Sequence, residues 1–169
     1  GESRRQKGRY RWYGDDQLDL GQLEVKNKKN KLGWKDTYKI LKKPFSNNDS
    51  WAQVMKNITL DLPDIAQHTL KLYSFPVISN SYLRSYFISY DQKIRITIDT
   101  KQKAYDQRYK SKPNFSAQSR LLDTFVLECK FDSADRNIVT DLLTGLPIRV
   151  SRHSKYMNCL NAVSGRGYY

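Results

Sequence analysis

The stretch KIRITIDTK, residues 93–101, alternates apolar and polar side chains along its length. The apolar positions are Ile94, Ile96 and Ile98. Arg95 and Asp99 are among the polar residues, so the period of two predicts a strand with one apolar and one polar face. An arginine at the centre of the polar face is unusual for a strand that only faces solvent. We therefore ask whether other strands share this feature.

Four further stretches alternate in the same way and carry Arg or Lys near their centres. They are GRYRWYG (8–14), GQLEVKNKKNKLGWKDTYKIL (21–41), SYLRSYFISYD (81–91) and TFVLECKFD (124–132). The second is predicted to be a hairpin, because Asn, Lys and Gly residues separate its two alternating halves. The third is predicted to lead through a turn at Asp91 and Gln92 into the opening stretch. The sequence therefore predicts several antiparallel strands with basic faces.

Helices are predicted between and after these strands. Residues 48–58 have apolar side chains at helical spacing, with Asp49 or Ser50 as the N-cap. Residues 132–147 show a clearer apolar stripe that ends at a glycine followed by a proline. A shorter helix is predicted to begin near Ser154. These helices could cover a sheet.

Composition limits the possible classes of protein. The 169 residues include 30 Lys and Arg against 17 Asp and Glu, a formal charge of +13, which favours a polyanionic partner. Cys129 and Cys159 have no metal-ligand spacing, so a disulfide framework or a zinc site is not supported. No apolar run is long enough to cross a bilayer. We expect a single domain over residues 1–169, truncated at its N-terminus, with residues 101–123 as a long loop.

The basic strand faces allow two interpretations. They could be the wet faces of an open sheet, although many like charges would then repel one another without benefit. They could instead line the interior of a closed barrel, where a bound polyanion supplies the countercharge. Glu24 and Glu128 each share a face with a lysine, Lys26 and Lys130. Either glutamate could balance charge or bind a divalent metal ion.

The order of the motifs RYRWYGD, LEVKNKK, GWK, YLRSYF, IRITIDT, VLECKF and SRHSKY resembles the vacuolar transporter chaperone (VTC) domain of polyphosphate polymerases. That domain belongs to the triphosphate tunnel metalloenzyme superfamily, which also includes the CYTH phosphatases. The resemblance covers roughly residues 8–160. It implies an α+β fold, an antiparallel eight-stranded β-barrel tunnel with flanking helices. The family's first strand has no counterpart here, so the tunnel is expected to lack one strand in this chain.

The resemblance also implies roles for individual residues. The side chains that line the tunnel and bind the triphosphate would be Arg9, Arg11, Lys26, Lys35, Arg84 and Arg95. Further contacts to phosphate would come from Tyr82, Arg152, Ser154 and Lys155, and Lys130 is added because it shares the face of Glu128. Glu128 matches the carboxylate that holds Mn²⁺ or Mg²⁺, and Glu24 is a second candidate. Tyr82 could instead fill the strand, and Ser154 could cap a helix.

The expected activity is transfer of the terminal phosphate of ATP to a growing polyphosphate chain. Two other classes stay open: a tunnel triphosphatase, and a non-catalytic module that binds polyphosphate or RNA. Nucleic acid is disfavoured, because alternation places Trp12 and Phe87 opposite the arginines, where they would pack in a core. We expect a cytoplasmic protein, with membrane association only through missing regions or partner proteins.

Overall fold

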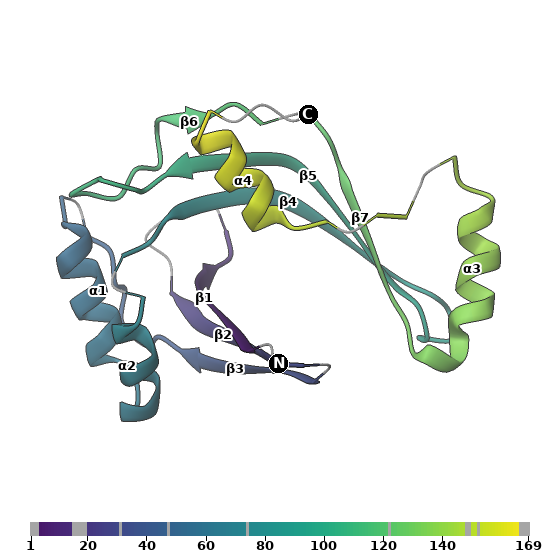
Figure 1. Ribbon diagram of the computed structural model, residues 1–169, viewed down its shortest axis with the longest axis horizontal. Coiled ribbons are helices and arrows are strands. Elements are labelled where there is room, and N and C mark those ends of the chain that lie inside the picture. The colour runs from purple at the N-terminus through teal and green to yellow at the C-terminus, as the bar shows by residue number, and fades with distance from the viewer. Residues whose placement is uncertain are drawn as a thin grey trace. The chain divides into compact units, whose positions relative to one another are not determined.

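The computed structural model describes residues 4–14, 20–30, 32–46, 48–73, 75–121, 123–147, 150–151 and 153–165. Contacts divide the chain into two compact units, residues 1–77 with 107–113 and residues 78–106 with 114–169. Both units combine an antiparallel sheet with helices, so the α+β class is confirmed (Figure 1). The single domain and the closed eight-stranded barrel stay predictions.

The first unit contains a three-stranded antiparallel sheet in the order β1-β2-β3. Its strands are β1 (Arg4–Trp12), β2 (Gly21–Lys29) and β3 (Leu32–Lys39). The predicted hairpin is therefore confirmed, and β1 begins earlier than the GRYRWYG motif. A Cβ atom on Gly21 would collide with the carbonyl oxygen of Arg11, so glycine permits the close pairing of β1 with β2 at this point.

Helices α1 (Trp51–Leu60) and α2 (Asp64–Lys71) complete the first unit. The Ser50 hydroxyl accepts a hydrogen bond from the amide of Gln53 and caps α1, as predicted. The second helix was not predicted. The buried apolar side chains of this unit include Leu23, Val25, Ile40, Phe45, Trp51, Val54, Ile58, Leu62, Ala66 and Leu70. Leu23 and Val25 come from the sheet face opposite most of the lysines and arginines, Ile40, Phe45 and Leu62 from connecting segments, and the others from the two helices.

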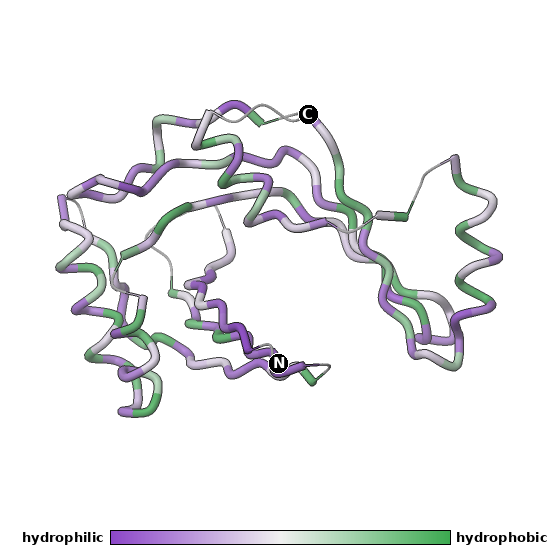
Figure 2. The backbone as a smooth tube through the Cα atoms, in the orientation of Figure 1, coloured by the Kyte–Doolittle hydropathy of each residue, from purple (hydrophilic) through white to green (hydrophobic). Residues whose placement is uncertain are grey.

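The second unit is built on β4 (Ile78–Ile88) and β5 (Arg95–Asp106), which pair antiparallel. The short strands β6 (Gln118–Ser119) and β7 (Val126–Lys130) pair with different ends of β5. The prediction of a loop over residues 101–123 was wrong for two segments of this range. Strand β5 continues to Asp106, and residues Gln118–Ser119 form β6. Hydrophilic and hydrophobic residues follow one another along β4 and β5 (Figure 2).

A 3₁₀ turn (Ser133–Asp135) leads into α3 (Arg136–Thr144) at one end of this sheet, and α4 (Lys155–Val163) lies across β4 and β5 (Figure 1). The Ser154 hydroxyl accepts a hydrogen bond from the amide of Met157 and caps α4. No helix within the described residues is long and apolar enough to span a membrane.

Trp12 and Phe87, the two aromatic residues predicted to pack in a core, differ in the structure. Trp12 packs its ring near those of Tyr10 and Phe45, as predicted from its position opposite the arginines. Phe87 also lies opposite the arginine of its strand, but its side chain is exposed. The prediction that Phe87 is a core residue was therefore wrong; α4 contacts the opposite face of the sheet, where Lys155 reaches Asp99.

Candidate functional site

The three strands of the first unit place most of their cationic residues on one face; Arg4 and Lys29 pair on the opposite face. Residues paired across antiparallel strands share a face, and Lys7, Lys26 and Lys35 lie in one such row. The next rows pair Arg9 with Glu24 and Arg11 with Gln22. The complete basic face comprises Arg5, Lys7, Arg9, Arg11, Lys26, Lys28, Lys35 and Lys39. The register thus brings together the four predicted site cations of this unit.

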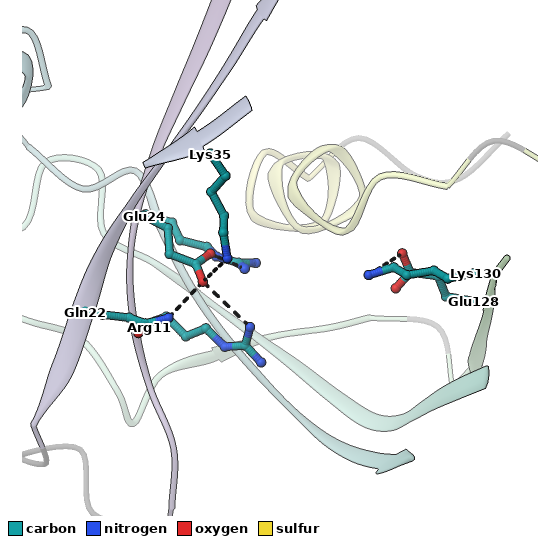
Figure 3. A network of polar contacts seen from close by, with 7 residues as sticks. Arg11, Gln22, Glu24, Lys35, Glu128 and Lys130 are labelled. Atoms are coloured by element: carbon teal, nitrogen blue, oxygen red, sulfur yellow. Dashed lines mark hydrogen bonds and ion pairs between the residues drawn. The ribbon is translucent and has the colours of Figure 1, made fainter. Parts of the chain in front are cut away.

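Glu24 lies at the centre of this face with only 1% of its side chain exposed. Its Oε2 accepts a hydrogen bond from Nε of Arg9 at 2.8 Å and a shorter one from Nη2 of the same guanidinium. Its Oε1 accepts from Nζ of Lys35 at 3.3 Å and from Nε2 of Gln22 at 2.9 Å. Figure 3 shows Lys35, Gln22 and Arg11 pointing toward this carboxylate, with Nη1 of Arg11 at 3.9 Å.

The ionised form of Glu24 is favoured in this setting. Burial alone would raise the pKa of Glu24, because a charge loses its hydration, but the hydrogen bonds and charges of Arg9 and Lys35 outweigh that effect. The net result is a pKa below the usual value for glutamate. Glu24 therefore carries a negative charge that holds several cations side by side, and both of its oxygens already accept hydrogen bonds.

The second unit repeats this arrangement on β4, β5 and β7. Arg84 pairs with Asp99 across the sheet, Thr97 pairs with Glu128, and Arg95 pairs with Lys130. These residues alternate along their strands with the apolar ones, so they share one face. Arg84, Arg95, Glu128 and Lys130 were all predicted site residues, and the register confirms that their strands are neighbours.

Asp99 is fully buried and holds two predicted site cations. Its Oδ1 accepts a hydrogen bond from Nε of Arg84 at 2.5 Å, and its Oδ2 accepts one from Nη2 at 2.7 Å. Nζ of Lys155, the first residue of α4, forms an ion pair with Oδ2. Burial alone would raise the pKa of Asp99, but the hydrogen bonds and charges of Arg84 and Lys155 lower it below the usual value.

Tyrosine rings flank these cations. The guanidinium carbon of Arg84 lies 5.1 Å from the ring centroid of Tyr82 and 5.9 Å from that of Tyr86. Nζ of Lys155 lies 5.1 Å from the centroid of Tyr82. Cation–π contacts of this length restrict where a long side chain can point. Tyr82, predicted either to fill the strand or to belong to the site, thus contacts two site cations directly.

Glu128 differs from the two buried carboxylates. Its side chain is 44% exposed, and its recorded ion pair is with Nζ of Lys130 at 3.6 Å (Figure 3). Thr97, its partner across the strands, has a buried hydroxyl oxygen without a hydrogen-bond partner among the described residues. A carboxylate and a hydroxyl oxygen on adjacent strands are hard oxygen ligands of the kind that Mg²⁺ and Mn²⁺ prefer. Glu128 therefore fits the predicted metal ion better than Glu24 does.

Within the described residues, no three His, Cys, Asp or Glu side chains cluster closely enough to hold a metal ion by themselves. A divalent ion that also binds substrate phosphates needs only one or two carboxylates. The proposed metal ion would accordingly depend on the nucleotide for part of its coordination.

The remaining predicted residues are placed as follows. Ser154 caps α4, the role that the sequence left open beside phosphate binding. Arg95 is exposed on β5. Arg152 lies outside the described residues. Asp99 was not predicted as a site residue. It lies four residues after Arg95 in the same strand, so the period of two places it on the same basic face. Gln22, two residues before Glu24, was missed as well, and the same alternation could have found it.

Comparison with known proteins yields one match. The family model of the VTC domain matches residues 1–164. No curated protein and no solved structure matches the chain. The matched residues include both basic sheet faces and all but the final residues of the chain. The chain therefore belongs to the VTC domain family.

Proposed function

We propose that this chain is the catalytic domain of a polyphosphate polymerase that transfers the terminal phosphate of ATP to a growing polyphosphate chain. VTC domains are associated with polyphosphate polymerase activity. One observation carries the proposal for this chain. Each sheet has a buried, ionised carboxylate that holds arginine and lysine side chains together on one face. Such clusters of fixed cations suit the dense negative charge of linked phosphates.

The transfer itself needs little chemistry from side chains. An ionised oxygen of the terminal polyphosphate group attacks the γ-phosphorus of ATP and forms the new P–O bond. The bond from that phosphorus to the β,γ-bridging oxygen breaks, and its electron pair leaves on ADP. The attacking oxygen carries no proton, so no general base is required. The transition state is loose, so alignment and charge neutralisation provide most of the acceleration.

The proposed roles in binding phosphate and the metal ion follow from the position of each residue on its sheet. Arg9, Arg11, Lys26 and Lys35 would bind phosphates along the first sheet. Arg84, Arg95, Lys130 and Lys155 would do so along the second, with Ser154 and Arg152 as further contacts. Glu128 would hold Mn²⁺ or Mg²⁺, which supplies charge neutralisation to the triphosphate when bound. The cytoplasm supplies ATP and is the proposed location.

The test is to incubate the protein with ATP and Mn²⁺ and to separate the products on a gel. A ladder of long phosphate chains supports a polymerase. Release of free phosphate or tripolyphosphate without a ladder would instead identify a hydrolase. Tight RNA binding without ATP turnover would identify a binding module. Arg95→Ala and Glu128→Ala should each abolish most of the ladder, and Lys71→Ala, an exposed position at the end of α2, should leave it unchanged.

A further inference from the structure

Asp99 is a buried acid in a region that must bind anions, which requires an explanation. An acid next to the phosphate site repels the ligand and costs desolvation free energy on folding. Asp99 nevertheless has no exposed side-chain surface and contacts two of the cations proposed to bind phosphate. We therefore look for an advantage to phosphate binding in the way that Asp99 arranges these two cations.

The geometry of the Arg84 contact shows what this benefit is. Asp99 engages Nε and Nη2, which form one edge of the planar guanidinium. A fork of two parallel hydrogen bonds fixes both the direction and the plane of the group. The Nη1 end takes no part in this fork. The rings of Tyr82 and Tyr86 lie within cation–π range of the same guanidinium and further restrict its rotation.

Lys155 reaches Asp99 from a different part of the chain. It is the first residue of α4, and its ammonium group shares Oδ2 of Asp99 with Nη2 of Arg84. An ammonium group has three N–H donors, so one ion pair leaves donors for another anion. The shared carboxylate holds two like charges together that would otherwise move apart, and it joins the beginning of α4 to the sheet.

We propose that Asp99 is a positioning residue that holds Arg84 and Lys155 in the arrangement that binds adjacent phosphates of one chain. This inference rests on the proposed function for the identity of the ligand. Asp99 does not touch the phosphates. It orders the two cations before the ligand arrives, so that binding does not have to restrict two long, flexible side chains.

A simpler role makes the opposite prediction. If Asp99 only balanced charge, its removal would make the site more positive, and anions would bind more tightly. If Asp99 positions the cations, Asp99→Asn should weaken binding despite the gain of positive charge. Inorganic tripolyphosphate is a suitable probe, because its binding does not require catalysis. We expect its dissociation constant to rise by about tenfold or more, by analogy with carboxylates that orient metal ligands.

The experiment measures tripolyphosphate binding by calorimetry for the wild type, Asp99→Asn and Asp99→Glu, with the melting temperature of each protein. Asp99→Glu keeps the charge but moves the carboxylate outward, so it serves if Asp99→Asn fails to fold. Weaker binding by Asp99→Glu supports positioning, and unchanged binding contradicts it. The matched control is Asp141→Asn on the exposed surface of α3, which makes the same change in net charge and should bind like the wild type.

A double-mutant cycle adds a second readout. If Asp99 acts partly through Lys155, the loss from Asp99→Asn should be smaller in the Lys155→Met background, where only Arg84 is left to be positioned. Additive losses would overturn the inference, as would equal or tighter binding by folded Asp99→Asn, or no binding by the wild type. The product gel is read separately. Absence of a polyphosphate ladder with the binding pattern intact would refute the polymerase and leave the role of Asp99 standing.

Discussion

Glu24 in the first unit and Asp99 in the second are both buried carboxylates surrounded by cations, but those cations come from different distances along the chain. Arg9, Gln22 and Lys35 all lie on β1, β2 and β3, which are consecutive strands. Asp99 instead receives Lys155 from a helix that begins more than fifty residues later. The first cluster is a property of one sheet, whereas the second combines a pair within the sheet, Arg84 and Asp99, with a lysine that α4 supplies.

The degree of burial separates the clusters further. The Arg9 side chain is 45% exposed, and the Arg84 side chain is 17% exposed. A cation that is shielded from water interacts more strongly with its partners and its ligand. We therefore expect single substitutions to have larger effects on phosphate transfer in the second cluster than in the first.

The largest expected effect is that of Arg84→Ala on activity. Loss of a fixed donor that stabilises developing charge typically costs about 2.7 to 4 kcal/mol, or about 100- to 1,000-fold in kcat. Arg9→Ala should cost less, because Arg11 and Lys35 still surround Glu24. Steady-state rates of ATP consumption with Mn²⁺ measure both. Equal losses in the two variants would contradict the expected difference between the clusters.

The next effect is on stability, from Glu24→Gln. This change removes the buried negative charge and leaves Arg9, Arg11 and Lys35 facing one another, so the free energy of unfolding should fall by about 3 kcal/mol. Urea denaturation measures the loss. The control is Glu128→Gln, the same chemical change at a half-exposed side chain, which should alter stability by less than about 0.5 kcal/mol.

A third effect is the dependence of stability on pH. The pKa values of Glu24 and Asp99 are lowered in the folded protein, so both groups bind protons more readily when unfolded. Their contribution is present above the unfolded pKa values, about 4, and is lost as pH falls through the lower folded values. Urea midpoints measured from pH 6 down to pH 3 should fall, and Glu24→Gln should show a shallower decline.

His153 extends this pH dependence in the second unit. Partial loss of hydration and the nearby charge of Lys155 lower the pKa of His153 and outweigh the opposing charge of Asp99, so the neutral ring is favoured in the folded state. Stability should therefore also fall as pH drops below the ordinary histidine pKa of about 6.5. His153→Gln should remove the part of the slope between pH 7 and pH 5. An unchanged slope in that interval would contradict the assignment.

The smallest effects come from the two serine caps, which form a matched pair. Ser50→Ala and Ser154→Ala each remove a hydroxyl that accepts a hydrogen bond from the third residue of its helix, at a cost of about 1 kcal/mol. Only Ser154→Ala should also weaken tripolyphosphate binding, because α4 carries Lys155. Thermal unfolding and calorimetry on the two variants test this, and weaker binding by Ser50→Ala would show that the effect is not specific to α4.

Features that depend on residues close in sequence could be predicted, whereas features that depend on contacts between distant segments could not. Alternation predicted which residues share a face, and it placed Arg84, Arg95, Glu128 and Lys130 correctly, because the period of two is a local property of strands. Ser50, one of two predicted caps, and Ser154, predicted as a cap or a phosphate contact, both cap their helices, because capping depends on residues close in sequence. The extension of β5 to Asp106 was not predicted, since its register is set by pairing with β4 rather than by its own pattern.

The role of Asp99 shows where sequence reasoning ended. Its place on the basic face could be predicted, but its contact with Lys155 depends on how α4 packs on β4 and β5. By spacing alone, Glu24 and Glu128 look equivalent, since each precedes a lysine on its own face, and only the family resemblance favours Glu128. The structure separates them by burial, because Glu24 is covered by Arg9, Lys35 and Gln22, whereas Glu128 is half-exposed.

The central claim is that the basic face of each sheet binds phosphate groups. Lysine acetylation followed by mass spectrometry, at increasing tripolyphosphate concentration, tests this most directly. We predict that Lys26 and Lys35 of the first unit and Lys155 of the second each become protected from acetylation, while Lys71 on α2 does not. The claim is contradicted if the lysines of either sheet stay unprotected, or if Lys71 is protected to the same extent.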